Sequence, residues 1–362
     1  MSRDPALDLS LRAELATRGV RTGVPVQLGI PVRRSGGAGP SDDGHVRLGG
    51  LATALPLNAN SPYLLAEGRL TGPGGLLMDL EVEPVRRPAF YDLTFADGTP
   101  YTAVARLHGT SVLASTVIQT CTRYTLEQTR CRFCAIEQSL DGGRTPAVKT
   151  PEQLVEVALA AVAHDGVEQV VLTTGTTPGS DRGAAHLVRI VTALHDVLPD
   201  LPVQVQVEPP ADLTWIRRLH EAGATAIGIH VESLDQTVRE VWTPGKAEVP
   251  LSRYDQAWLE AVDVFGPNRV STYVLLGLGE DPDDTVKACA RLIEMGVYPF
   301  VVPFRPMAGT LAADVPAPDS DYVADITRRV ARLLVGAGMR GADQGAGCAA
   351  CGACGLLQAA GG

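Results

Sequence analysis

The sequence has few basic residues and no long apolar run. Lysine and arginine total 31 against 41 aspartate and glutamate residues, which gives a net charge of −10. An acidic chain is a poor partner for nucleic acid or an anionic membrane, so we expect neither. No stretch reaches the roughly 18 apolar residues of a membrane span, and the polar start Met1-Ser-Arg-Asp-Pro has no signal-peptide pattern. We therefore expect a cytoplasmic protein.

Cysteine is also scarce, but it is clustered. Six of the seven cysteines fall in two triplets, Cys121/Cys131/Cys134 and Cys348/Cys351/Cys354. In a cytoplasmic chain such clusters indicate metal binding rather than disulfides. The seventh, Cys289, stands alone in a predicted helix, and we expect it to be a small buried hydrophobic residue.

The first triplet has the spacing C-x9-C-x2-C and follows an apolar strand predicted over 111–119. Three thiolates can hold three irons of a [4Fe-4S] cluster and leave the fourth iron open to a small ligand. An open iron suits a cofactor that must be bound and reductively cleaved. The alternative is a zinc site, with the C-x2-C pair as half of a zinc knuckle.

From residue 111 onward, predicted strands and helices alternate. The strands are predicted at 111–119, 169–173, 203–207, 226–231, 270–276 and 298–304, and the helices at 151–161, 184–197, 213–222, 254–265, 284–295 and 321–336. The strands are short apolar runs, as expected when both faces of a parallel sheet are buried. Six such units predict an α/β fold, a partial or full TIM-like (β/α) barrel over residues 111–338, with chemistry at the C-terminal ends of its strands.

Residues 1–110 lack this alternation. A helix is predicted over 7–16, strands over 76–82 and 89–95, and a hairpin turn at Asp97-Gly98 with a return strand over 102–107. The Gly-rich stretch 34–44 is expected to be a flexible loop. This part is interpreted as a small β-rich N-terminal subdomain, and residues 339–362 as a Cys-rich C-terminal tail.

The cluster loop resembles that of the radical S-adenosylmethionine (SAM) superfamily. The usual spacing there is C-x3-C-x2-C; here the aromatic Phe133 between the last two cysteines is kept and the first gap is stretched to nine. Members cleave SAM on the unique iron to a 5'-deoxyadenosyl radical. The resemblance therefore implies a catalytic [4Fe-4S] cluster on the first triplet, SAM as cofactor, a small-molecule substrate, and an external one-electron reductant such as flavodoxin or ferredoxin.

The resemblance also implies SAM contacts at the strand ends. A carboxylate at a strand end can accept both hydroxyls of a ribose, so Glu232 is a ribose candidate together with the neighbouring His230. A Gly-Leu-Gly-Glu segment is similar to the one that passes under adenine in biotin synthase. The alternative role for Gly175 is a tight turn that needs glycine. The alternative for His230 is a structural histidine whose hydrogen bonds are made within the protein, and the alternative for Glu232 is a carboxylate in a surface loop. The full set of implied contacts is Phe133, Thr174, Gly175, Thr176, Glu208, His230, Glu232, Gly277 and Gly279.

The resemblance to the biotin synthase barrel covers residues 111–338, but biotin synthase chemistry is not expected. Those enzymes hold a sulfur-donating cluster with cysteines on inner strands, and the strands at 169–173, 203–207 and 270–276 contain none. The arrangement resembles an uncharacterised radical SAM subfamily found in bacterial gene clusters that also encode a nitrilase-type enzyme. That resemblance implies a small, nitrogen-containing metabolite as substrate.

The tail has the spacing C-x2-C-x2-C of ferredoxin-type cluster loops, which predicts a second [4Fe-4S] cluster; zinc or no metal are the alternatives. The residues between Gly336 and Cys348 can span roughly 40 Å when extended. We therefore expect the tail to fold back across the barrel mouth and cap the active-site end. The competing interpretation of the whole chain is a non-catalytic iron–sulfur or zinc-binding protein with an electron-transfer or structural role.

Overall fold

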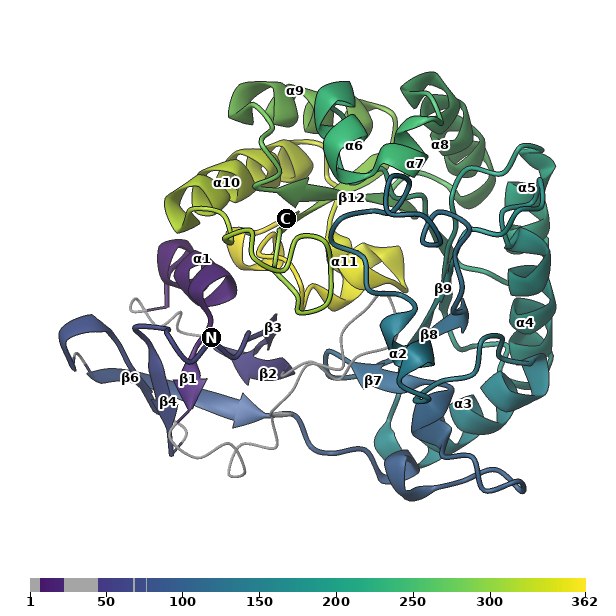
Figure 1. Cartoon of the computed structure of the whole chain (residues 1–362), viewed down its shortest axis with the longest axis horizontal. Helices are drawn as coiled ribbons and strands as arrows, with labels where there is room; N and C mark the ends of the chain where they lie inside the picture. The colour runs from purple at the N-terminus through teal and green to yellow at the C-terminus, as the bar shows by residue number, and fades with distance from the viewer. Residues whose placement is uncertain (1–6, 23–44, 68, 76) are drawn as a thin grey trace.

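A computed structural model describes residues 7–22, 45–67, 69–75 and 77–362 (Figure 1). These residues form two sheets, one of seven strands and one of six. In the ranges described, no helix is both long and apolar enough to cross a membrane.

The seven-stranded sheet is the scaffold of the molecule. Its strands are β7 (Arg106–His108), β8 (Val112–Ile118), β9 (Gln169–Thr174), β10 (Val203–Gln206), β11 (Ala226–Gly228), β12 (Val270–Leu276) and β13 (Val297–Pro303). They lie in sequence order across the sheet, β8 to β13 are parallel, and β7 pairs with β8 in the antiparallel sense. Since β7 and β13 are the two edges of this sheet, the barrel is partial rather than closed.

Helices follow the parallel strands and cover the outer face of the curved sheet (Figure 1). The helices on this face are α3 (Pro151–Asp165), α4 (Ala184–Val197), α5 (Thr214–Glu221), α8 (Leu251–Phe265), α9 (Pro282–Glu294) and α10 (Ser320–Gly336). The short helices α2 (Gln138–Asp141), α6 (Gln236–Trp242) and α7 (Pro244–Ala247) lie in the loops that follow β8 and β11. The start of α3 is determined by neighbouring residues in the sequence: Thr150 and Gln153 form a reciprocal capping box, and Pro151 occupies the first helical position. The predicted alternation of six βα units is confirmed.

The N-terminal part forms the second sheet. Its elements are α1 (Leu9–Arg18), β1 (Arg21–Thr22), β2 (His45–Leu48), β3 (Leu51–Ala54), β4 (Leu64–Ala66), β5 (Arg69–Thr71) and β6 (Leu77–Pro84). A small core of its own lies under this sheet, and α1 packs against α10 of the barrel. The β-rich character is thus confirmed; the exact domain boundaries stay a prediction, and the Gly-rich stretch 34–44 lies outside the described residues.

One predicted strand in this part is wrong, and another is present only in its last residues. Residues 89–95 contain a 3₁₀ turn, Ala89–Asp92, whose backbone N–H groups at Ala89 and Phe90 are held by the carboxylate of Asp165 at the end of α3. The predicted return strand begins with another 3₁₀ turn, Tyr101–Ala103, and only β7 follows. The turn at Gly98 is present, with Phe95 N–H donating to Thr99 O at 2.8 Å. Burial of Cys289 within α9 is confirmed.

The tail, which contains α11 (Cys348–Cys351), lies within the curve of the sheet (Figure 1). It enters from the end where the strands begin: Arg269, just before β12, donates to Gln344 O at 3.0 Å, and Gly347 N–H donates to Gln169 Oε1, at the start of β9, at 2.7 Å. The expectation that the tail crosses the mouth at the C-terminal strand ends is therefore wrong. Buried apolar packing of Leu357 helps to hold it in the core.

Candidate active site

The loop that carries Cys121, Cys131 and Cys134 follows β8 at the C-terminal end of the sheet and is anchored from three sides. Thr122 N–H donates to Thr176 O after β9 at 2.9 Å, and Arg132 N–H donates to Trp242 O of α6 at 2.8 Å. On the third side Arg132 O accepts from Ala312 N–H at 3.0 Å. These backbone contacts fix the loop without using the cysteine side chains, which are left for another role.

Gly175 is required by close packing against this loop. A Cβ at this position would lie 2.0 Å from Thr120 O, next to Cys121. The backbone after β9 therefore approaches the cluster loop more closely than any residue with a side chain allows. This supports the tight-turn interpretation of Gly175.

We expect Gly175→Ala to push the cluster loop away from β9. Overpacking of this kind costs about 1–3 kcal/mol in the free energy of unfolding, and the displaced loop should bind metal less well. The matched control is Gly336→Ala, because a Cβ there meets nothing within 4 Å. Thermal unfolding and iron content of both variants provide the check; equal behaviour would contradict the packing argument.

Two thiols of this loop, Cys131 and Cys134, are buried enough to be protonated without a metal. Burial raises the pKa of Cys134 to about 12 and that of Cys131 well above its usual value. The charged side chains of Lys246 and Glu232 act on both thiols, so the ion pair lies beside the triplet. Metal binding at this loop would release protons, because thiolates are the ligands.

A cavity of about 410 Å³ lies inside the barrel next to the loop. Cavities of about 300–1,000 Å³ accommodate small-molecule ligands. Of the predicted SAM contacts, six line it: Phe133, Thr174, Thr176, Glu208, His230 and Glu232. Gly175, Gly277 and Gly279 do not line it.

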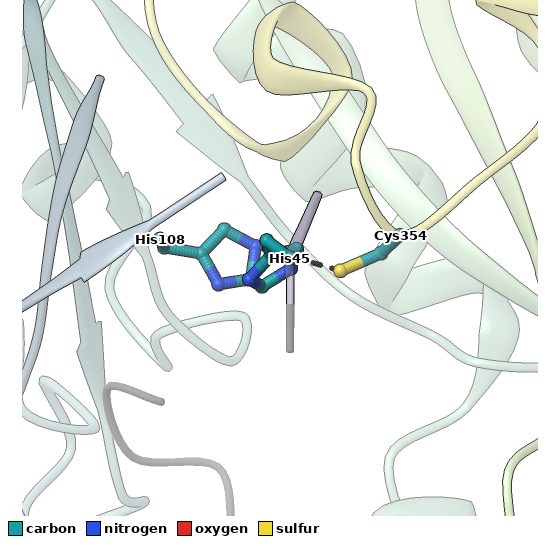
Figure 2. Close-up of side chains that lie close together, drawn as sticks. All are labelled: His45, His108 and Cys354. Atoms are coloured by element: carbon teal, nitrogen blue, oxygen red, sulfur yellow. Dashed lines mark hydrogen bonds between the residues drawn. The ribbon is translucent and has the colours of Figure 1, made fainter. Parts of the chain in front are cut away.

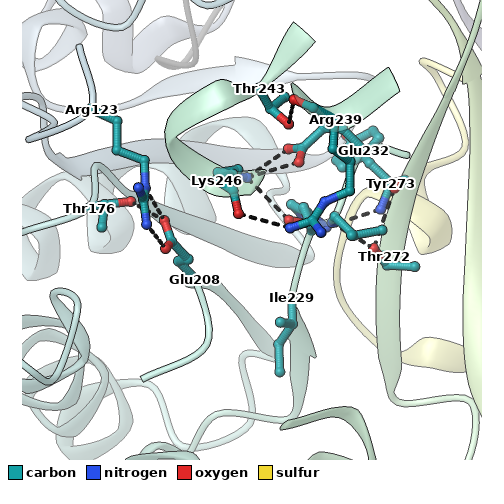
Figure 3. A network of polar contacts seen from close by, with 12 residues as sticks. Arg123, Thr176, Glu208, Ile229, Glu232, Arg239, Thr243, Lys246, Thr272 and Tyr273 are labelled. Atoms are coloured by element: carbon teal, nitrogen blue, oxygen red, sulfur yellow. Dashed lines mark hydrogen bonds and ion pairs between the residues drawn. The ribbon is translucent and has the colours of Figure 1, made fainter. Parts of the chain in front are cut away.

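The two carboxylates in the cavity wall have different surroundings (Figure 3). Both oxygens of Glu208 bind the guanidinium of Arg123, and one also accepts from Thr176 Oγ1 at 2.9 Å. Although burial opposes ionisation, Arg123 holds the pKa of Glu208 below its usual value. Because Arg123 belongs to the cluster loop, Glu208 ties that loop to β10 and has little capacity left for a ligand.

Glu232 is paired with Lys246 on α7, whose Nζ lies 2.9 Å from each carboxylate oxygen (Figure 3). Despite the cost of burial, the Glu232 charge keeps the pKa of Lys246 above its usual value, so Lys246 is charged. Burial raises the pKa of Glu232, and the charge of Lys246 opposes that rise. Glu232 also has φ of 62°, a left-handed conformation that is uncommon for residues other than glycine. Such strain is concentrated at functional sites.

His230 offers an unused donor to the cavity. Its Nδ1 accepts from the Tyr273 N–H at 3.2 Å, so the proton of the neutral ring is on Nε2. Burial, and secondarily the charge of Lys246, lowers the pKa of His230 to about 3. Its buried Nε2 has no hydrogen-bond partner among the described residues, so this N–H is available to a bound molecule.

The two glycines after β12, Gly277 and Gly279, lie in a bend of the chain and do not line the cavity. Gly277 has φ of 94°, and a Cβ there would lie 2.5 Å from Pro318 Cβ. The carboxylate of Glu280 accepts from the N–H groups of Gly277 and Leu278 at 2.6 and 2.7 Å. Gly279 also has positive φ, at 102°. The predicted adenine contact at these glycines stays a prediction.

Sequence reasoning missed several polar side chains that line the cavity, among them His108, Gln206, Lys246 and Tyr273. It also missed Arg123, which binds Glu208. Lys246 sits in a short helix 14 residues from Glu232, and no motif marks it. The alternation of Gln204 and Gln206 within β10 was a usable signal, because two amides on consecutive inward positions of a buried strand need partners.

The tail cysteines form the opposite wall of the same cavity. Cys348, Cys351 and Cys354 line it, and Gln206 Nε2 donates to Cys348 Sγ at 3.2 Å. Burial raises the pKa of Cys348 to about 11 and that of Cys351 to about 12. The pKa of Cys354 is lowered despite burial, because His108 and His45 lie beside it. The first triplet does not line the cavity itself; its loop reaches the cavity through Phe133 and Ile136.

A partial parallel barrel with a three-cysteine loop at the C-terminal end of its first parallel strand, beside a ligand-sized cavity, defines a cofactor-dependent (β/α)-barrel enzyme. Residues 120–293 match the Radical SAM superfamily. The match spans 174 of the 362 residues, from the cluster loop to α9, so this part of the chain is similar to the superfamily.

Individual proteins that match the chain share less than 30% of its sequence over the aligned residues. The chain is 26% identical over 224 residues to bacteriochlorophyllide c C-7(1)-hydroxylase of Chlorobaculum limnaeum, covering 57% of this chain and 55% of the relative. It is 28% identical over 195 residues to the chloroplastic lipoyl synthase 1 of Populus trichocarpa, covering 52% and 48%. The chain spans about half the length of these curated relatives. The solved structure of methylornithine synthase (PylB) aligns with a TM-score of 0.47 at 16% identity, covering 69% of this chain and 72% of the other.

Proposed function

We propose that this protein reductively cleaves SAM at a [4Fe-4S] cluster held by Cys121, Cys131 and Cys134. The observation that carries the proposal is the position of this triplet, anchored after β8 beside the cavity. These three thiolates would hold a cluster that, when bound, would supply the electron for breaking the C5'–S bond of SAM, giving methionine and a 5'-deoxyadenosyl radical that takes a hydrogen atom from a substrate. The alternative is a metal centre without catalysis.

The donor set supports a cluster over a single ion. Zn–S bonds of about 2.3 Å place the sulfurs of a tetrahedral site about 3.8 Å apart. Within the described part of the chain, one group of three metal-ligating side chains has all its ligand atoms within 4.8 Å, and it contains neither complete cysteine triplet. Both triplets are therefore spread more widely than the ligands of one zinc ion.

The chain's own residues would orient SAM and substrate. Glu232 projects from the end of the fourth parallel strand with an ionic partner that fixes it, which supports its role at the ribose. The Nε2–H of His230 would donate to a ligand oxygen or nitrogen. The cavity lined by the tail cysteines and by Phe133 of the cluster loop would hold a small substrate, for which a nitrogen-containing metabolite is proposed from the subfamily resemblance alone.

A second [4Fe-4S] cluster on Cys348, Cys351 and Cys354 forms part of the proposal. Its support is the convergence of three thiols on the same cavity and the hydrogen bond from Gln206 to one of them. Hydrogen bonds to ligating sulfur tune the reduction potential of a cluster. An external one-electron donor such as flavodoxin or ferredoxin would reduce the enzyme.

We expect Glu232→Gln to weaken SAM binding about tenfold or more, since a hydrogen bond to a charged group contributes about 1.5–3 kcal/mol. The substitution also leaves the charge of Lys246 without its partner, so a double variant with Lys246→Met separates the two effects. SAM binding should stay weak in the double variant while the cluster spectrum is unchanged. Recovery of SAM binding in the double variant would show that Glu232 serves only to balance Lys246.

Metal analysis tests the choice between cluster and zinc. Protein purified and reconstituted without oxygen should be brown and contain iron and acid-labile sulfide in equal amounts, about four of each per cluster. A colourless protein with one zinc per triplet would overturn the proposal.

A further inference from the structure

Most polar side chains around the cavity are already bound within the protein. At the tail end, His45 and His108 face Cys354, and His108 Nε2 lies 3.4 Å from its Sγ (Figure 2). The Tyr273 side chain hydrogen-bonds to Cys348. The hydroxyl groups on the strand walls bind the backbone, one another or a carboxylate: Ser115, Thr116, Thr173, Thr174 and Thr176. Few hydrogen-bonding groups are therefore left for a bound molecule.

Among the described residues, His230 and Gln206 each present one atom without a hydrogen-bond partner to this cavity. On His230 that atom is Nε2, which carries the proton of the neutral ring. Gln206 uses its Nε2 to donate to Gln204 Oε1 at 2.9 Å and to Cys348 Sγ at 3.2 Å, and its Oε1 accepts no hydrogen bond. The amide orientation is fixed because Gln204 Oε1, which also accepts from the Cys348 N–H at 3.4 Å, needs a donor facing it.

Gly228 brings these two groups together. It pairs with Gln206 across β10 and β11, and a Cβ on it would lie 2.9 Å from His230 Nε2 and 3.1 Å from Gln206 Cγ. The imidazole therefore occupies the space of the missing side chain and points back along β11, away from the strand end. The open donor and the open acceptor lie side by side on the inner face of the sheet.

The charged side chains near this pair have partners of opposite sign. Arg123 binds both carboxylate oxygens of Glu208, and Lys246 binds both oxygens of Glu232. Burial, and secondarily the charge of Lys246, lowers the pKa of His230, so the ring itself is uncharged at neutral pH. A charged group beside the imidazole would be buried without a counter-ion, which is costly. The open donor and acceptor therefore suit a neutral group.

We propose that the substrate presents a neutral amide to this pair: His230 Nε2–H donates to the amide oxygen, and Gln206 Oε1 accepts from the amide N–H. The inference rests on the proposed function, in which this cavity holds the substrate, and names the class of that substrate. An amide carries its acceptor and its donor on two atoms, which matches two protein groups from adjacent strands about 4.8 Å apart. A carboxylate lacks the donor and an amidinium lacks the acceptor, so each leaves one buried protein group unpaired. The ribose of SAM is then left to Glu232.

Three probes of the same planar shape test this selectivity: benzamide, benzoate and benzamidinium. Each is titrated by calorimetry, without oxygen or reductant, into the full reconstituted chain with saturating SAM. Benzamide should bind about tenfold or more tightly than either charged probe, and by the same margin more tightly than benzyl alcohol, whose one oxygen both donates and accepts. Absence of benzamide binding, or another probe that binds as tightly, would overturn the amide assignment.

Two variants separate the donor from the acceptor. His230→Phe should lose the preference for benzamide over benzamidinium but keep that over benzoate, because only the donor is removed. Gln206→Leu should do the reverse. His164→Phe, on the exposed face of α3, is the matched control and should keep both preferences. Variants that lose both preferences, or neither, would overturn the pairing.

SAM cleavage by the same preparation, started with dithionite, distinguishes this inference from the proposed function. A protein that cleaves SAM but shows no preference for benzamide keeps the proposed function and loses the amide assignment alone. A protein that prefers benzamide but leaves SAM intact loses the proposed function, and with it the identity of the bound amide as a substrate.

Discussion

Replacing Cys131 by alanine should abolish SAM cleavage. The loop would keep its backbone anchors at Thr122 and Arg132, so the fold should survive. Two thiolates cannot hold a cluster that needs three, so iron and sulfide at this loop should be lost with activity. The measurement is 5'-deoxyadenosine formed per chain under anaerobic reducing conditions, together with iron content.

Cys289→Ala provides the matched control for Cys131→Ala. Cys289 is fully buried in α9, away from the cavity lining, so its loss should cost some stability and leave the cluster in place. Undiminished SAM cleavage in Cys131→Ala, or in Cys134→Ala, would remove the assignment of the catalytic cluster.

The second large effect is expected in the tail. Replacing Cys348, Cys351 and Cys354 together by serine should lower iron from about eight to about four per chain. SAM cleavage should remain, because the first triplet is untouched, whereas conversion of the true substrate should be lost. Full iron content or normal substrate turnover in this variant would contradict a functional tail cluster.

Side-chain replacement is preferable to truncation of the tail. Leu356 and Leu357 follow the triplet and are buried in the main core, so removing the tail would also remove apolar packing. Losing a buried leucine costs about 2–5 kcal/mol. A truncated chain could lose activity through instability alone, while serine keeps the tail backbone and its packing.

The barrel could be predicted because its signals are local. A strand such as β13 is buried on both faces and reads as a short apolar run, and the capping box at Thr150 marks a helix start without tertiary information. The position of the first triplet at a strand end followed from the same pattern. Sequence patterns were enough to predict these elements because the residues that determine them are close in sequence and in space.

The polar pairs and the tail could not be predicted because they join distant segments. Arg123 and Glu208 lie 85 residues apart, and His108 and Cys354 lie 246 apart. The reach of the linker before the tail permitted either end of the barrel, and only the contacts with Arg269 and Gln169 decide between them. The 3₁₀ turn at Ala89 likewise depends on Asp165 of a later helix.

The proposed SAM cleavage is tested most directly by measuring the products formed from SAM. Reconstituted wild-type protein incubated without oxygen with SAM and dithionite should yield methionine and 5'-deoxyadenosine in equal amounts, and omission of dithionite should stop both. Iron-loaded protein that leaves SAM intact under these conditions would contradict its assignment as an enzyme that cleaves SAM at the Cys121/Cys131/Cys134 cluster.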